Sequence, residues 1–150
     1  MIEYSELLKS YKEDFEVTSK ASYGKVLLVD DDRSINQGLE RFLKQKNFEV
    51  VISYSGREGL NKLTHDTSVI ILDVKLPKED GTEVYSRLKE KRPEIPIIFY
   101  SAYPGEESKA RKCFELNPFA FVEKGGAENI DRLFSLIQKA TQMATIHPQS

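Results

Sequence analysis

The chain contains 150 residues, of which 39% are hydrophobic and 31% charged, and its formal net charge is −2. This length suits one domain whose core needs no disulfide or metal to hold it together. The near-neutral charge, without a basic block, argues against a nucleic-acid scaffold, and the single cysteine, Cys113, excludes a disulfide framework or a thiolate metal site built within the chain.

Residues 1–23 form a polar leader before the first predicted strand. Tyr4, Leu8, Tyr11 and Phe15 follow helical spacing, which indicates a helix that covers its own domain or a partly ordered linker, or alternatively a dimerisation or docking helix. The leader lacks the basic start and apolar centre of a signal peptide. No stretch of the sequence reaches the roughly 18 apolar residues of a membrane span. We therefore expect a cytoplasmic protein that does not bind membranes.

From residue 25 the sequence alternates between predicted strands and helices. Continuous apolar runs predict five buried strands, at residues 26–29, 48–52, 69–72, 97–100 and 119–122. Helical spacing predicts five helices: from Ile35 to Lys46 with Asn47 as its stop, a short one opened by Ser55-Gly56, one through Val84 and Leu88 that ends before Pro93, one over 106–116 with Ala110, Cys113 and Phe114 inward, and a last one carrying Ile130, Leu133, Phe134, Ile137 and Ala140. This alternation is typical of right-handed βαβ units and a mostly parallel sheet. We expect a domain at 24–142, with a leader at 1–23 and a tail at 143–150.

Carboxylates follow two of the predicted strands. Asp30 and Asp31 come directly after the first strand, and Asp73 comes directly after the third. These strands are expected to be neighbours where the sheet order reverses, so the three acids should converge at one edge. Two carboxylates about 4 Å apart repel by about 4 kcal/mol at an effective dielectric of 20, and a divalent cation such as Mg²⁺ relieves that repulsion. Alternatively, Asp30, Asp31 and Asp32 belong to a solvated loop that caps the next helix, a role that suits Asp32 because an acid near a helix N-terminus is favoured.

Two later strands end in groups that suit a phosphoryl ligand. Ser101 follows the fourth strand with a hydroxyl, and Lys124 follows the fifth with an ammonium. A cation, a hydroxyl and an ammonium around one carboxylate form a clamp for a phosphoryl group in transfer. The carboxylate itself can act as the nucleophile and become an aspartyl phosphate. A single lysine after a strand is usually a surface residue, whereas the complete set is a specific signal.

This set of residues resembles the receiver domain of two-component response regulators of the chemotaxis-regulator type. The similarity runs from about residue 25 to residue 139 and implies an α/β fold: a doubly wound, five-stranded parallel sheet of flavodoxin-like order 2-1-3-4-5 with helices on both faces. It rests on Val29-Asp30-Asp31-Asp32, on Leu72-Asp73 followed by Leu76-Pro77 and Asp80-Gly81, on Tyr100-Ser101-Ala102, and on Phe121-Val122-Glu123-Lys124.

The resemblance implies a role for each matching acid. Asp73 would be the phosphoacceptor. Asp30, Asp31 and Asp73 would hold Mg²⁺ or Mn²⁺, and the backbone carbonyl of Lys75 would complete the protein ligands. The domain would not be an enzyme, but would assist its own Mg²⁺-dependent phosphoryl transfer and autodephosphorylation.

The resemblance also implies a switch. Ser101 and Lys124 would contact the phosphoryl oxygens, and Ser101 with the ring of Phe121 would change position on phosphorylation, together with the loop 102–107. One departure stands out: the family usually has Lys-Pro after the fifth strand, whereas Gly125-Gly126 follow Lys124 here. This departure predicts a looser loop at the lysine.

A phosphorylation-dependent switch of a protein-interaction surface is therefore the expected function. The donor would be a histidine kinase or a histidine phosphotransfer protein. The switched surface would act on a downstream protein or on an effector domain outside this sequence. We expect no direct nucleic-acid binding by this chain, and a homodimer is a further alternative.

Two alternative functions remain. A pseudo-receiver would act as a phosphorylation-independent binding module and would not respond to beryllofluoride with Mg²⁺. A phosphatase of the haloacid dehalogenase type would hydrolyse a small phosphomonoester, but it needs a second Asp two residues after the nucleophile, where this chain has Lys75.

Overall fold

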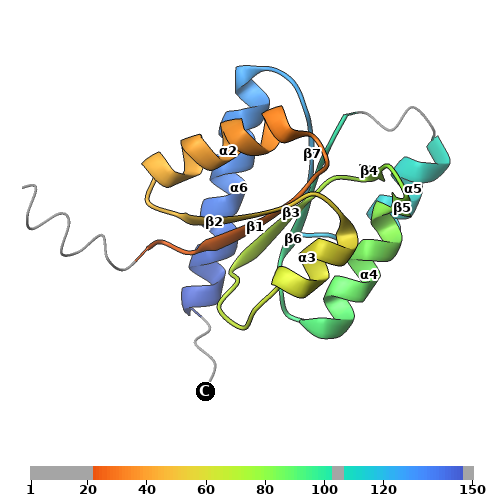
Figure 1. Ribbon diagram of the computed structural model, residues 1–150, viewed down its shortest axis with the longest axis horizontal. Coiled ribbons are helices and arrows are strands. Elements are labelled where there is room, and N and C mark those ends of the chain that lie inside the picture. Colours follow the sequence, from red (N-terminus) through yellow and green to blue (C-terminus); the bar gives the residue numbers. More distant parts are fainter. Residues whose placement is uncertain (1–21, 103–106, 147–150) are drawn as a thin grey trace, which may run out of the picture.

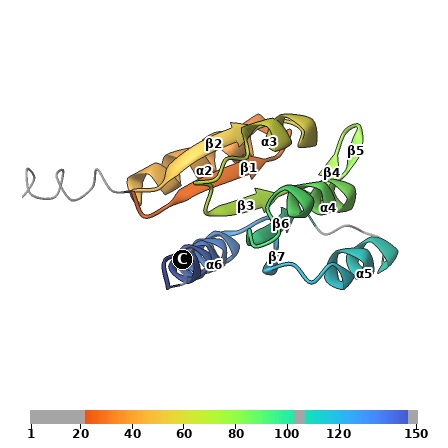
Figure 2. The ribbon, with the colours of Figure 1, turned by 90° about the horizontal axis from the view of Figure 1, so that it is seen from below.

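The computed structural model describes residues 22–102 and 107–146, and its centre is a five-stranded sheet with helices on both faces (Figures 1 and 2). All neighbouring strands of this sheet are parallel. Their order, β2-β1-β3-β6-β7, corresponds to 2-1-3-4-5 along the chain and confirms the predicted topology. The strands are β1 (Lys25–Val29), β2 (Glu49–Ser53), β3 (Val69–Leu72), β6 (Ile97–Ser101) and β7 (Ala120–Glu123).

Helices connect successive strands, and the sequence marks where several of them begin and end. Asp32, Ser55 and Asp80 each accept a backbone N–H from the first turn of the helix that follows, as good N-cap residues do. Asn47 adopts a left-handed φ of 68° just after the first helix, which confirms it as the predicted stop. The helices of the described residues are α2 (Arg33–Gln45), α3 (Gly56–Lys62), α4 (Gly81–Lys91), α5 (Glu107–Glu115) and α6 (Ala127–Ile146).

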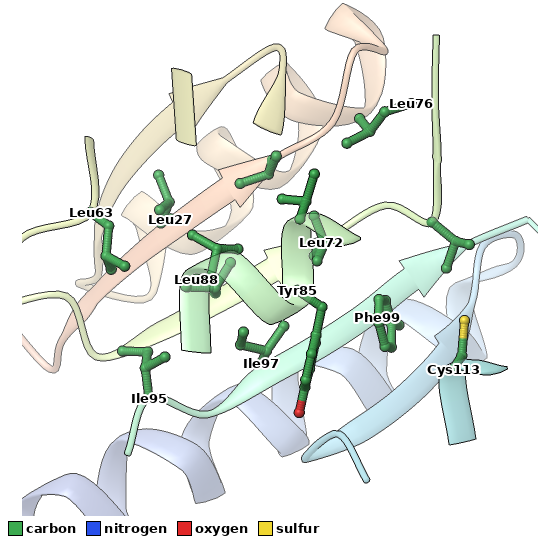
Figure 3. Packing of buried hydrophobic residues seen from close by; sticks show 14 residues of the cluster. Leu27, Leu63, Leu72, Leu76, Tyr85, Leu88, Ile95, Ile97, Phe99 and Cys113 are labelled. Carbon is green, nitrogen blue, oxygen red and sulfur yellow. The ribbon is translucent and has the colours of Figure 1, made fainter. Parts of the chain in front are cut away.

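The sheet separates the core into two halves because successive strand residues point to opposite faces. One half lies under α2 and α6 and contains Leu43 and Ile137. The other half lies under α3, α4 and α5, and in Figure 3 its centre is the stacked pair Tyr85 and Phe99, whose ring centroids are 5.2 Å apart. With both faces covered, β3 and β6 are buried at every residue, which explains the apolar runs at residues 69–72 and 97–100.

The fourth predicted helix is correct in position but wrong in one inward residue. Cys113 is fully buried and Ala110 half-buried, whereas the side chain of Phe114 is 64% exposed. Adjacent helix residues point about 100° apart, so with Cys113 directed into the core Phe114 lies at the margin of the inward face of α5. Strand β7, beneath α5, is also the edge of the sheet, which leaves less surface to cover Phe114.

A short antiparallel hairpin between β3 and α4 was not predicted. It consists of β4 (Lys75–Leu76) and β5 (Glu79–Asp80), in which Lys75 pairs with Asp80 and Leu76 with Glu79. The final helix also continues to Ile146, past the start of the predicted tail. The aromatic stripe of the leader and most of the predicted switch loop, residues 103–106, lie outside the described residues. None of the helices in the described part of the chain is long and apolar enough to cross a bilayer.

Candidate metal and phosphoryl site

The carboxyl ends of four adjacent strands bring the predicted site residues to one edge of the sheet. Val29 pairs with Leu72, so Asp30 and Asp73 directly follow neighbouring positions. Ser101 is the last residue of β6, and Lys124 directly follows β7. Oxygens of Asp30, Asp31 and Asp73, one from each, lie within 4.8 Å of one another.

Asp73 lies at the centre of the site. The residue is 6% exposed. Its Oδ1 accepts a hydrogen bond from Ser101 Oγ at 2.7 Å and one from the Lys75 backbone N–H at 3.2 Å. Its Oδ2 accepts a hydrogen bond from Lys124 Nζ at 3.3 Å. The hydroxyl and the ammonium predicted to hold a phosphoryl group are therefore both in contact with this carboxylate.

Asp30 is the second buried acid of the site. Its Oδ2 lies 2.6 Å from Lys124 Nζ, and its Oδ1 accepts the Asp32 backbone N–H at 2.9 Å. Burial nevertheless raises the pKa of the Asp30 carboxyl to about 6, because the desolvation of the carboxylate outweighs these two contacts and nearby Asp73 adds a like charge. A cation would relieve this electrostatic cost.

Lys124 links the two buried acids in spite of the unusual glycines that follow it. Burial alone would lower the pKa of its ammonium, but the contacts with Asp30 and Asp73 together hold that pKa above the ordinary value. Gly125 and Gly126 have φ angles of 115° and 79°, which proline, fixed near −65°, cannot adopt. The Lys124 backbone N–H still donates to the Ser101 carbonyl at 2.8 Å. The glycines change the path of the loop after the lysine, and Lys124 remains fixed at the site.

Asp31 and Asp32, which follow Asp30 in the sequence, differ from it in their surroundings. Asp31 is exposed at the rim of the site. Asp32 caps α2, accepting backbone N–H groups from Ser34 at 3.0 Å and Ile35 at 3.2 Å. Of the three consecutive acids, Asp30 and Asp31 therefore belong to the site and Asp32 to the helix.

One contributor to the site was missed by the sequence reasoning. Asn36 is fully buried, and its Nδ2 donates to the Asp30 backbone carbonyl at 2.7 Å. The signal was present, since Asn36 precedes Leu39 and Leu43 at i, i+3 and i+7 and so lies on the inward face of α2. A polar residue on that face needs a buried partner.

The acid cluster fits Mg²⁺. Its three side-chain ligands are all carboxylate oxygens, which are the donors that this hard cation prefers. Asp30 and Asp73 are buried and Asp31 is exposed, so the cluster has one side open to water. The backbone of Lys75, already in contact with Asp73 through its N–H, lies at the same rim.

Phe121 lies behind this edge of the sheet rather than in the site. It is half-buried on β7, with its ring centroid 6.1 Å from that of Phe99 and 5.8 Å from that of Phe114. Its neighbour across the sheet is Phe99, two residues before Ser101. A shift at the end of β6 would therefore change the surroundings of the Phe121 ring.

Comparison with known proteins agrees with this geometry. Residues 26–138 match the family model described as response regulator receiver domain. The cell cycle response regulator CtrA of Brucella ovis is 39% identical over 89 residues, which cover 58% of this chain and 38% of that protein; the values for CtrA of Brucella canis are the same. The chain thus spans about two fifths of the length of these curated relatives.

Solved structures show the same fold. A response regulator receiver domain protein from Clostridium thermocellum superposes with a TM-score of 0.71 at 24% identity, covering 82% of this chain and 98% of that one. A second similar structure is the response regulator TrrA from Thermotoga maritima, solved in complex with Mg²⁺ and BeF. It superposes with a TM-score of 0.66 at 25% identity, and the match covers 78% of this chain and 98% of the TrrA chain.

Proposed function

Because the chain belongs to the family of response regulator receiver domains, we propose that Asp73 is its phosphoacceptor and that a histidine kinase or a histidine phosphotransfer protein is the donor. The contacts of Asp73 carry this assignment. Its carboxylate is buried, receives Ser101 and Lys124, and shares a cluster with Asp30 and Asp31. No other carboxylate in the described residues combines these contacts.

The proposed reaction is a displacement at phosphorus. An Asp73 oxygen forms the new O–P bond while the N–P bond of the donor phosphohistidine breaks, and the imidazole leaves with the electron pair. Asp30, Asp31, Asp73 and the Lys75 carbonyl would hold Mg²⁺, which supplies positive charge to the phosphoryl oxygens when bound. Lys124 Nζ, now shared by Asp30 and Asp73, would move to a phosphoryl oxygen and stabilise its charge.

The proposed output is a change of surface. A phosphoryl group on Asp73 carries about −1.5 to −2 charge in place of the single charge of the carboxylate and would draw the Ser101 hydroxyl from Asp73 Oδ1 toward a phosphoryl oxygen. Ser101 is the last residue of β6, so its shift would pass to Ala102 and to the half-buried ring of Phe121. The partner that reads this surface would be a downstream protein, an effector domain outside residues 24–142, or a second copy.

Labelling with acetyl phosphate tests the assignment of Asp73. We expect the wild-type chain to incorporate phosphate with Mg²⁺ and not with a chelator, and Asp73→Asn to incorporate none. Asp66→Asn is the matched control, because Asp66 lies before β3, at the opposite end of the sheet from the site. Label retained in Asp73→Asn, or lost in Asp66→Asn, would refute the assignment.

A further inference from the structure

Glu79 connects the segment that follows Asp73 to a helix on another part of the sheet. Glu79 belongs to β5, the second strand of the short hairpin that follows Asp73. This hairpin lies beside α4 in both ribbon views (Figures 1 and 2). Its Oε2 accepts the Gly56 backbone N–H at 2.6 Å, and its Oε1 accepts the Arg57 backbone N–H at 3.2 Å. One carboxylate thus joins the hairpin to the first turn of α3, 22 and 23 residues earlier in the chain.

The surroundings of this contact are adapted to it. A Cβ at residue 56 would lie 2.4 Å from Val84 Cγ2 and 3.0 Å from Glu79 Oε2, so only glycine allows so close an approach. The hydroxyl oxygen of the N-cap Ser55 accepts a hydrogen bond from the next backbone N–H of α3, that of Glu58. The side chains of Ser55 and Glu79 therefore divide the first three amides of α3 between them, and a carboxylate is the favoured acceptor at a helix start.

Besides Glu79, the hairpin is held by the buried side chain of Leu76 and by Asp80, which caps α4. Its two strands contain two residues each, and so short a hairpin is not stable by itself. Leu76 pairs with Glu79 and Lys75 with Asp80, so an anchor at Glu79 also fixes the Lys75 backbone. That backbone donates its N–H to Asp73 Oδ1 at 3.2 Å.

We propose that Glu79 is a positioning residue for the cation site: its carboxylate ties the hairpin to α3 and thereby holds the Lys75 backbone in place beside Asp73. This inference rests on the proposed function, in which the Lys75 carbonyl is a Mg²⁺ ligand. Groups that orient metal ligands commonly change metal affinity by about 10- to 100-fold when removed. Since Glu79 acts through backbone pairing, the lower end of that range is expected.

Mg²⁺ titration of the full chain, followed by amide NMR, tests the proposal with a graded pair of variants. We expect Glu79→Met to weaken Mg²⁺ binding about tenfold. Glu79→Gln should lie between Met and wild type, since its amide oxygen can still accept one N–H. Glu83→Gln is the matched control for charge: Glu83 is exposed, lies four residues further along, and has no hydrogen bond or ion pair among the described residues.

Two further measurements separate positioning from a general loss of stability. Amide hydrogen exchange at Gly56 and Arg57 should accelerate in Glu79→Met, and urea unfolding shows how far each variant is destabilised. If exchange accelerates while the affinity matches that of Glu83→Gln, the contact exists and the positioning role is refuted. Unchanged exchange refutes the contact itself. If the wild-type chain binds no Mg²⁺, the proposed function itself fails. If Mg²⁺ binds wild type and Glu79→Met equally well, only the positioning role of Glu79 fails.

Discussion

Two lysine–aspartate pairs lie at opposite ends of the same sheet, and burial rather than chemistry distinguishes them. Lys25 Nζ lies 3.3 Å from Asp66, with side chains 22% and 55% exposed, whereas Lys124 Nζ lies 2.6 Å from Asp30, with side chains 15% and 7% exposed. A hydrogen bond from Thr64 and the contact with Lys25 hold the pKa of Asp66 below its ordinary value. Burial raises that of Asp30 to about 6.

The comparison shows what makes one end of the sheet a site. The exposed pair exchanges water for a partner with little net gain, so it is worth about 0–1 kcal/mol. At Asp30 the cost of desolvation exceeds what the contact with the Lys124 ammonium returns, so this end of the sheet favours additional positive charge. A bound cation can supply this positive charge. The need for it arises only at the end of the sheet where the acids are buried.

The largest expected effect is the difference in stability between two variants, one lacking the lysine of the buried pair and the other lacking the lysine of the exposed pair. Lys124→Met should lower the free energy of unfolding by about 3 kcal/mol at pH 8 without Mg²⁺, because Asp30 and Asp73 remain buried without a cationic partner. Lys25→Met should change it by less than about 1 kcal/mol. Urea unfolding followed by circular dichroism measures both. Added Mg²⁺ should restore more stability to Lys124→Met than to wild type, and equal losses in the two variants would contradict the comparison.

The pH dependence of stability should have opposite signs for the two acids. The pKa of Asp30 is raised from 3.8 to about 6, so the folded state holds this proton more tightly than the unfolded chain does. The contribution of Asp30 to stability without Mg²⁺ should therefore fall by about 2 kcal/mol as the pH rises from about 4 to above 6. The pKa of Asp66 is lowered from 3.8, so its contribution to stability is smaller and has the opposite sign: it increases as the pH rises toward about 4.

Urea unfolding of wild type, Asp30→Asn and Asp66→Asn across about pH 3 to 8 resolves these two contributions. Asp30→Asn should remove the decline and be more stable than wild type at pH 8. Asp66→Asn should keep the decline and lose only the small gain at the acid end. Parallel pH profiles of wild type and Asp30→Asn would show that burial does not dominate at Asp30.

Much of this fold follows from the sequence because parallel strands are buried on both faces. Each predicted strand lies within one residue of the observed strand at both ends, since an uninterrupted apolar run ends where the chain leaves the core. The convergence of Asp30, Asp73, Ser101 and Lys124 followed from the strand order alone. Ends of neighbouring parallel strands must share an edge.

The remainder depends on contacts that leave no periodic signal. Strands β4 and β5 have two residues each, too few for any period, so the hairpin and the role of Glu79 were not predicted. The sequence showed that Gly125 replaces proline but not that its φ of 115° leaves Lys124 within 2.6 Å of Asp30. Phe114 was misplaced because helical spacing does not show how little of the inward face of α5 is covered above the edge strand β7.

Proton competition should sharpen the distinction at the buried end. In the proposed site Asp30 would bind Mg²⁺ as a carboxylate, and with a pKa of about 6 only about one tenth of it is ionised at pH 5. The apparent affinity for Mg²⁺ should therefore fall about tenfold between pH 7 and pH 5. Amide NMR titrations at the two pH values measure this. Asp30→Asn should bind more weakly at both, with little difference between them; an equally steep pH dependence in that variant would place the titrating group elsewhere.

The smallest expected effect is the response of the two pairs to salt. Double-mutant cycles should give a Lys25–Asp66 coupling of about 0.5 kcal/mol that disappears in 1 M NaCl, where the screening length is about 3 Å. The Lys124–Asp30 coupling should be larger and nearly unchanged by salt, because solvent ions cannot enter between groups that are 15% and 7% exposed. The cycles use the single and double substitutions of each pair at pH 8 without divalent cations. A buried coupling that falls with salt as steeply as the exposed one would mean that water reaches Asp30, and the burial that raises its pKa would then no longer distinguish the site from the other end of the sheet.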